Sequence, residues 1–251
     1  MIRRPSRMLM VLAVFVLATA GFATANEVTF GVHGGLSIPD IRGSSTDIFS
    51  QGFTSRQGPF FGISLETQVS PLFSLVAEIN YTSQGGKKNG MQVITNVPPG
   101  FPTDIYLYAD FKNETILDYL EVPVLARLNF GRRLRFFVNA GPYVGILVRA
   151  RAVTSGSSLI YLDQAGTQPI ISSPVSFDAN TDVKDSLRST NIGLYAGGGV
   201  KYPVGFGAFI LEAHFQLGLT TIQRDVATSG KSQTGAVVIS LGYNVALGGQ
   251  K

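Results

Sequence analysis

The feature that most constrains this sequence is a pair of long alternating segments, 116–130 and 134–150, joined by a tight turn at Gly131-Arg132-Arg133. In the first segment, alternate positions from Leu120 to Phe130 are apolar. A period of two over such a length indicates β-strands longer than the usual five or six residues. The opposite face mixes glycine, tyrosine and charged side chains, which is too sparse for a surface in water. The pattern favours a transmembrane barrel with lipid outside and polar groups in the lumen.

Two prolines interrupt this hairpin, Pro123 and Pro142. Proline has no N–H to donate to a strand ladder, so each one requires either a β-bulge or a locally unpaired partner carbonyl. The apolar alternation resumes in phase after both prolines. We therefore interpret them as bulges.

The first 25 residues have the organisation of a secretory signal peptide. Arg3, Arg4 and Arg7 precede an apolar run from Met8 to Ala20, and small residues at 23–25 form a cleavage site. The alternative is an N-terminal membrane anchor, for which the apolar run is short. The sequence contains no cysteine, which excludes a lipidated cysteine at the cleavage point and disulfide bonds in an exported fold.

The formal charge of +4 arises mainly from this leader. Three of the 20 basic residues lie in it, which leaves 17 basic against 16 acidic residues in the remainder. The basic pI is therefore no sign of nucleic-acid binding. After the leader, no apolar stretch reaches the roughly 20 residues of a membrane helix, so the classes left open are a secreted or periplasmic β protein and an outer-membrane barrel.

The alternation recurs along the chain and predicts eight strands. They are expected at 27–36, 59–69, 72–83, 116–130, 134–150, 187–202, 208–219 and 233–247. Their connections alternate between long loops, at 37–57, 84–115, 154–186 and 221–231, and short turns. This alternation is typical of outer-membrane barrels with both termini on the periplasmic side. We therefore predict an all-β, eight-stranded, antiparallel up-and-down transmembrane β-barrel as a single domain over residues 26–251.

Aromatic residues support this interpretation by their position. Six of them are expected to face outward beside the short turns: Phe73, Phe130, Phe136, Tyr202, Phe209 and Tyr243. Such a belt marks a lipid–water interface. The general preference of aromatic residues for strands would explain their presence but not their common level.

The lumen of an eight-stranded barrel is just wide enough for side chains to fill it. The side chains predicted to form a polar network there are Glu66, Glu78, Glu121, Arg127, Lys201, Glu212 and His214. Buried charges need partners, and we favour a structural network over a transport or catalytic role. Glu121 and Arg127 are six positions apart on one strand, roughly 20 Å, so each must find its partners on other strands.

No catalytic, cofactor-binding or metal-binding residues are predicted. The only histidines are His33 and His214, and no pattern arranges either of them with Ser64 or Ser240 in a triad. The sequence also lacks an H-E-x-x-H motif, a phosphate-binding loop and calcium-loop spacing. We therefore expect a protein without enzymatic activity and without a cofactor.

Several motifs resemble the PorT-like family of outer-membrane β-barrels. They are Tyr119–Leu125 (YLEVPVL), Ala140–Gly145 (AGPYVG), Gly31–Gly35 (GVHGG) and Gly193–Val200 (GLYAGGGV). The resemblance covers nearly the whole mature chain. It implies an eight-stranded barrel in the bacterial outer membrane and implies little about activity, because most members have no assigned function.

The expected role is therefore structural or interactive. The partners expected are outer-membrane lipid and an extracellular or envelope protein that contacts the long loops, above all 84–115 and 154–186. Nucleic acid is not an expected partner. A narrow channel for small solutes and a lipid-modifying membrane enzyme are the alternatives.

Overall fold

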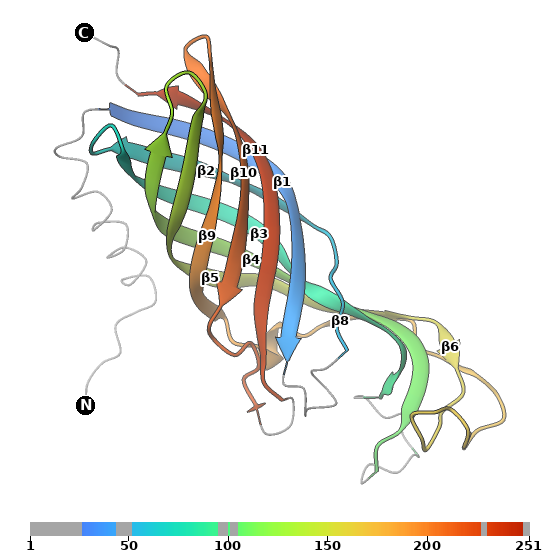
Figure 1. Ribbon diagram of the computed structural model, residues 1–251. Helices are drawn as coiled ribbons and strands as arrows, with labels where there is room; N and C mark the ends of the chain where they lie inside the picture. Colours follow the sequence, from blue (N-terminus) through green and yellow to red (C-terminus); the bar gives the residue numbers. More distant parts are fainter. Residues whose placement is uncertain (1–26, 44–51, 95–99, 101–104, 227–229, 248–251) are drawn as a thin grey trace, which may run out of the picture.

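The computed structural model describes residues 27–43, 52–94, 100, 105–226 and 230–247. The expected signal peptide, 1–25, lies outside these ranges. Eight long strands form a closed antiparallel ring, in which each strand pairs with its neighbours and β1 pairs with β11 (Figure 1). The strands are β1 (Glu27–Gly43), β2 (Gly58–Gln68), β3 (Phe73–Val93), β4 (Tyr108–Phe130), β5 (Arg135–Ser155), β9 (Thr190–Val204), β10 (Gly207–Gly218) and β11 (Ser232–Ala246). The predicted eight-stranded up-and-down barrel is confirmed. In the described part of the chain, no helix is both long and apolar enough to cross a membrane.

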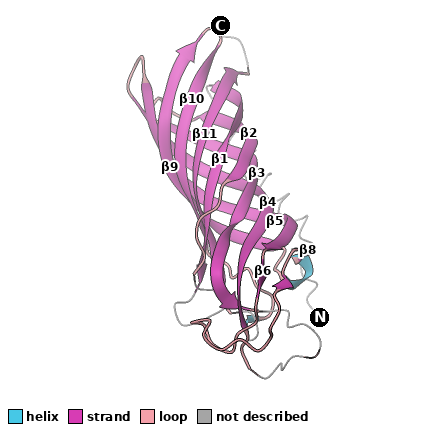
Figure 2. Cartoon of the chain, turned by 90° about the vertical axis from the view of Figure 1, so that its right-hand side faces the viewer, coloured by secondary structure: helices cyan, strands magenta, loops and turns pink. Residues whose placement is uncertain are grey.

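Three of the strands continue far beyond the ring. β3, β4 and β5 extend away from the loop end as a side arm (Figures 1 and 2). The arm also carries β6 (Ser157–Ser158), β7 (Val175–Ser176) and β8 (Ala179–Asp182), which pairs with the end of β5. A short 3-10 helix, η2 (Lys184–Ser186), follows. We call the described residues of these parts, within 85–116 and 151–186, the loop-end arm.

The arm corrects two loop expectations. The loop predicted at 84–115 is shorter than expected, because β3 runs to Val93 and β4 begins at Tyr108. The start of β4 falls within 104–111, where the sequence alternates again, a pattern compatible with an extension of the barrel strands. The sequence from Lys87 to Gly90 has no apolar alternation, yet its backbone is ordered by pairing with β4. Segment 154–186 contains β6, β7, β8 and η2 rather than irregular chain alone.

The arm has a hydrophobic core of its own. Its buried residues are Ile94, Leu107, Ala109, Phe111 and Ile160. Phe111 stacks on Phe177 with ring centroids 4.7 Å apart. The arm is therefore a packed unit and not only an extension of the sheet.

The bulges predicted at the two prolines are wrong. The β4–β5 offset is the same at the Pro123–Tyr143 pair as at the Ala126–Ala140 pair, and the β5–β9 pairing runs through Pro142 without a shift. Instead, the β3–β4 ladder lacks pairs at Val122 and Pro123, and the β4–β5 ladder lacks pairs at Gly141 and Pro142. Each proline therefore faces a locally unpaired stretch of the neighbouring strand, which is the alternative to a bulge. The register shift lies elsewhere, between Asp118 and Tyr119.

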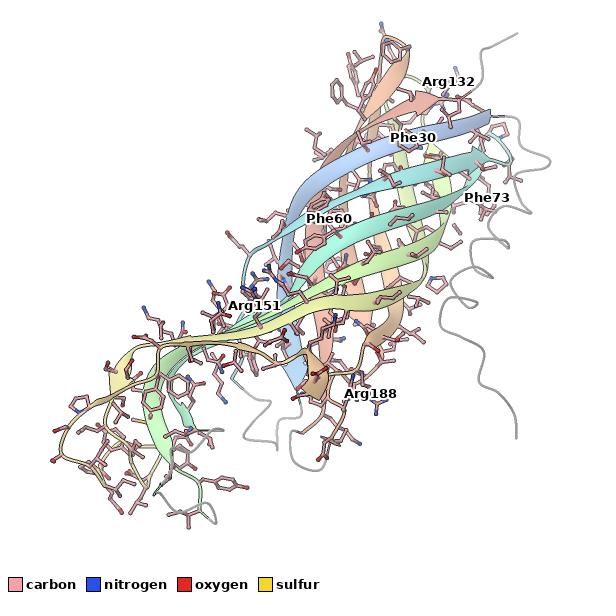
Figure 3. The ribbon with its side chains drawn as sticks, turned by 180° about the vertical axis from the view of Figure 1, so that it is seen from behind. Phe30, Phe60, Phe73, Arg132, Arg151 and Arg188 are labelled. Atoms are coloured by element: carbon pink, nitrogen blue, oxygen red, sulfur yellow. The ribbon has the colours of Figure 1, made fainter. Side chains whose placement is uncertain are left out.

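The outer surface of the ring is apolar over most of its height. Valine, leucine and isoleucine side chains on alternate positions are exposed, Leu211 at 55% among them. Of the six belt aromatics, Phe130, Phe136, Tyr202 and Phe209 are strongly exposed and Tyr243 packs against Phe209. Figure 3 shows Phe73 near the short-turn end, far from Arg151 and Arg188. This surface matches a lipid-facing band with an aromatic belt at one end.

Inward-facing glycines let the opposite side of the sheet fill a narrow lumen. At Gly197 on β9, an added Cβ would lie 2.4 Å from the Cβ of His214 and 2.5 Å from the carbonyl oxygen of Ala213. The neighbouring Ala196 faces outward and is exposed. Side-chain size is therefore restricted at Gly197, whereas the exposed side chain of Ala196 points away from the lumen.

This difference gives a stability prediction. Gly197→Val should destabilise the refolded barrel by about 1–3 kcal/mol or more, because the added atoms overlap backbone and His214. Ala196→Val is the matched control and should change stability little, since its side chain meets lipid. Urea unfolding of both variants measures the effect, and equal midpoints would contradict the inward placement of Gly197.

Candidate functional site

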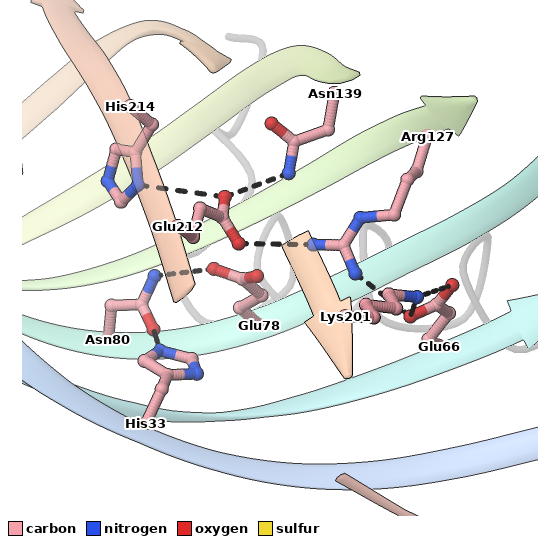
Figure 4. Close-up of polar contacts among 9 residues, drawn as sticks. All are labelled: His33, Glu66, Glu78, Asn80, Arg127, Asn139, Lys201, Glu212 and His214. Carbon is pink, nitrogen blue, oxygen red and sulfur yellow. Dashed lines mark hydrogen bonds and ion pairs between the residues drawn. The ribbon is translucent and has the colours of Figure 1, made fainter. Parts of the chain in front are cut away.

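The seven residues predicted for the lumen come from five strands. Glu66 lies on β2, Glu78 on β3, Glu121 and Arg127 on β4, Lys201 on β9, and Glu212 and His214 on β10. All of them are buried or largely buried. Together with neutral residues that the sequence analysis did not single out, they form successive polar layers across the lumen. Figure 4 draws the first two layers, and the layer around Glu121 lies outside that view.

The first layer lies nearest the short turns and contains two cations and two carboxylates. Arg127 donates from Nη1 to Glu66 Oε2 at 2.9 Å and from Nη2 to Glu212 Oε2 at 3.3 Å. Lys201 Nζ donates to both carboxylate oxygens of Glu66 at 2.6 Å. The Arg127 guanidinium also lies over the ring of Phe137, 4.1 Å from its centroid. Each buried charge thus has an opposite charge as a direct partner, which offsets its desolvation.

The second layer contains the two histidines. His33 Nε2 lies 2.8 Å from Asn80 Oδ1, and Asn80 Nδ2 donates to Glu78 Oε2 at 2.8 Å. The Phe60 ring separates the two imidazoles, at 5.5 Å from His33 and 5.4 Å from His214. His214 Nδ1 lies 3.7 Å from Glu212 Oε1, which links this layer to the first.

The third layer surrounds Glu121, which is fully buried. Gln84 Nε2 donates to Glu121 Oε1 at 2.7 Å, and the Tyr195 hydroxyl donates to Oε2. Gln216 Nε2 in turn donates to the Tyr195 hydroxyl at 2.7 Å. Among the residues that the structure describes, no cation forms an ion pair with Glu121. This carboxyl group is satisfied by neutral donors alone.

The loop end of the lumen is closed by apolar side chains. The residues packed there are Leu117, Tyr119, Leu147, Ala150 and Ile222, with Val183 and Leu187 against them. Ile222 comes from the connection between β10 and β11, so this connection covers the mouth of the barrel. Beside it, Arg56 binds Glu114 and Arg149 binds Asp118, both at 2.9 Å.

A cavity of about 20 Å³ remains between the first two layers. Its lining includes His33, Glu78, Glu212, His214 and Arg127, and Ser64 and Ser240 also contribute. This volume holds one or two water molecules. No group of three or more histidine and carboxylate residues within the described ranges has the geometry to hold a metal ion, and no hydrogen bond there joins either serine to a histidine.

The charged residues were found from the sequence, but most of their neutral partners were not. Asn80, Gln84, Tyr195 and Gln216 face inward by the same alternation that places the charges. Counting every inward polar residue, and not only the ionisable ones, would have identified Asn80, Tyr195 and Gln216, whereas Gln84 was assigned to the predicted loop 84–115. Which strand lies opposite in the lumen is not contained in the alternation.

The family comparison identifies the kind of barrel. A family model described as "Outer membrane protein beta-barrel domain" matches residues 19–224. No curated protein matches the sequence significantly.

The chain also matches solved structures at low identity. Neisserial surface protein A (NspA) is 15% identical, with a TM-score of 0.41, and the match covers 86% of this chain and 96% of that protein. Ail, the attachment invasion locus protein of Yersinia pestis, is 10% identical over 87% of this chain and 99% of its own, with a TM-score of 0.39. The N-terminal β-barrel domain of Pseudomonas aeruginosa OprF is 12% identical over 85% and 96%, with a TM-score of 0.33. At these values the likeness carries no argument about ligands or partners.

The first layer of the lumen gives a second stability prediction. Arg127→Ala should destabilise the refolded barrel by about 3–5 kcal/mol, because Glu66 and Glu212 each lose a buried ionic partner. Val124→Ala, a trimmed outward side chain on the same strand, should have a much smaller effect, since lipid fills the space. Urea unfolding midpoints compare the two variants. Equal midpoints would show that the ion pairs of Arg127 do not hold the lumen together.

Proposed function

Because this chain belongs to the outer membrane protein beta-barrel domain family and is located in the bacterial outer membrane, we propose that its barrel is a closed anchor that presents the loop-end arm outside the cell. The anchor holds the arm, and the arm carries the interaction with an extracellular or envelope partner. The role is structural or interactive rather than enzymatic.

The observation that carries this proposal is the filled lumen. Three hydrogen-bonded layers cross it one after another, from Glu66 through Glu78 to Glu121, and an apolar cluster covers its loop end. A solute would have to displace all of them. Each displacement would leave buried polar groups without partners, at about 1–3 kcal/mol per group and more for charged ones.

The arm supplies the second argument. A connecting segment without a role in binding needs no hydrophobic core, whereas the arm has a buried cluster around Leu107 and Phe111. Loops of outer-membrane barrels are long on the extracellular side, and a rigid, packed loop loses less conformational entropy when it binds a partner. Exposed Ile105, Tyr106 and Leu162 near the end of the arm offer apolar contact area.

The two alternatives are less well supported. A narrow channel requires a continuous path for water, whereas the hydrogen-bonded layers and the apolar cluster fill the described lumen around a cavity of about 20 Å³. A lipid-modifying enzyme requires a nucleophile and base that substrate can reach, whereas the side chains of Ser64, Ser240 and His214 are buried in the lumen.

Within the family, we propose the PorT-like branch. Two motifs that carry this resemblance, YLEVPVL and AGPYVG, lie opposite each other on β4 and β5, with Glu121 paired to Gly145 and Val122 to Val144. An added Cβ at Gly145 would lie 3.2 Å from Glu121 Cγ. The glycine of one motif thus makes room for the carboxyl side chain of the other, which gives the pair a common physical basis.

The closed lumen leads to a conductance prediction. The protein reconstituted in planar bilayers should give no sustained current, while an open porin prepared in the same way conducts. Arg127→Ala should also give none, because it disrupts the first layer and leaves the Glu121 layer in place. Sustained current through the unaltered protein would support the channel alternative instead.

The exposed arm leads to a labelling prediction, for which the absence of native cysteine is convenient. Cysteine at Ala165, an exposed residue of the arm, should react with an impermeant maleimide on intact cells. Cysteine at Arg132 in the β4–β5 turn should react only after the outer membrane is permeabilised. The reverse pattern would invert the barrel and refute the proposed presentation of the arm.

A further inference from the structure

Three arginines gather at the short turn between β4 and β5. Arg132 and Arg133 lie in the turn itself, Arg135 begins β5, and all three are exposed. Figure 3 shows Arg132 at the same end of the barrel as Phe30 and Phe73, opposite the end that carries Arg151 and Arg188.

These arginines have no carboxylate partner in the described part of the chain. None of the three takes part in an ion pair. At the described short-turn rim (27–28, 68–73, 129–135, 202–208 and 245–247), the only other side chain charged at neutral pH is that of Glu27. Arg135 pairs in register with Lys201, whose positive charge lies just inside the lumen. Among the described residues, the rim therefore carries an excess of positive charge that no neighbouring carboxylate neutralises.

The level of this cluster relative to lipid follows from the aromatic belt. Phe130 and Phe136 flank the turn on the two strands, face outward and are about half exposed. Aromatic belts lie at the boundary between hydrocarbon and headgroups. The arginines are one to three residues beyond them along the chain, which is the level at which lipid phosphates lie.

We propose that Arg132 and Arg133 bind the phosphates of anionic phospholipid headgroups in the leaflet that meets the short turns, with Arg135 adding to the positive potential. Guanidinium groups donate paired hydrogen bonds to phosphate oxygens with a geometry that lysine cannot reproduce. The site differs from the loop-end arm in position and in partner, and it would fix the depth of the barrel in the membrane.

The test compares two double variants of the full mature protein. Arg132→Ser/Arg133→Ser removes the proposed site, and Lys87→Ser/Lys112→Ser removes the same charge from the arm. Both are refolded into phosphatidylcholine vesicles with and without a minor fraction of phosphatidylglycerol, and the folding equilibrium is measured in urea. The two unfolded chains carry equal net charge, so a difference between the variants reports on the folded barrel.

Phosphatidylglycerol should favour folding of the unaltered protein and of the lysine variant. The arginine variant should lose about fivefold of this effect for each arginine, about 25-fold in all. An unchanged lipid response in the arginine variant, or an equal loss in the lysine variant, would overturn the proposal. A further measurement adds inorganic phosphate to pure phosphatidylcholine vesicles. If phosphate stabilised the unaltered protein as much as phosphatidylglycerol does, the ligand would be free phosphate instead of lipid. Because the measurement reports neither conductance nor labelling of the arm on intact cells, its outcome is separate from that of the proposed function.

Discussion

The structure depends on closure of the ring by the pairing of β1 with β11. In a bilayer no water is available to bond exposed backbone groups, so a sheet with an open edge cannot span it. Fifteen residue pairs, from Thr29–Ala246 to Gly43–Ser232, close this edge over the full length of β11. Closure in turn fixes which face of every strand is enclosed. Each side chain therefore belongs either to lipid or to a lumen that eight strands make narrow.

Narrowness then determines how the lumen can be filled. Charges on facing strands come within bonding distance, as Arg127 and Glu66 do from β4 and β2, although β3 lies between these strands in the ring. The first layer balances two cations with two carboxylates, whereas Glu121 is bonded by amide and hydroxyl donors. Two different means thus satisfy buried carboxyl groups in one lumen. Both require side chains from several strands, so the ring and its contents stabilise each other.

How much of this could be predicted from sequence depended on whether a feature is local. The strands, their inward and outward faces and the short turns follow from alternation and turn residues, which neighbouring positions reveal. The partners of Glu121 do not follow from neighbouring positions. Gln84 and Tyr195 are distant from it in the chain and carry no charge that a search for ion pairs would find. The strand segment from Lys87 to Gly90 was also missed, since its backbone is held by pairing with β4 and its side chains show no pattern. The unshifted register at Pro123 and Pro142 depends on close backbone approach at Gly141, where an added Cβ would lie 2.0 Å from the Val124 carbonyl oxygen.

The arm originates where the ring loses two of its pairings. The β2–β3 ladder ends at Phe60–Thr82, and the β5–β9 ladder ends at Ile146–Thr190. Beyond these points β3, β4 and β5 remain paired with one another and leave the ring together. The edge of β3 released near Gln84 is bonded by Arg56, whose Nη1 donates to the Gln84 carbonyl oxygen and to Ser83 Oγ. On the other side, β8 replaces β9 as the partner of β5, so the released backbone groups are bonded again.

The register shift between Asp118 and Tyr119 lies where the three strands leave the ring, and Asp118 there binds Arg149. The polar pairs Arg56–Glu114 and Arg149–Asp118 thus lie where the lipid-facing sheet ends and the arm begins. In each pair a buried charge, that of Arg56 or Asp118, binds a more exposed partner, Glu114 or Arg149, which at this level meets water and headgroups instead of hydrocarbon.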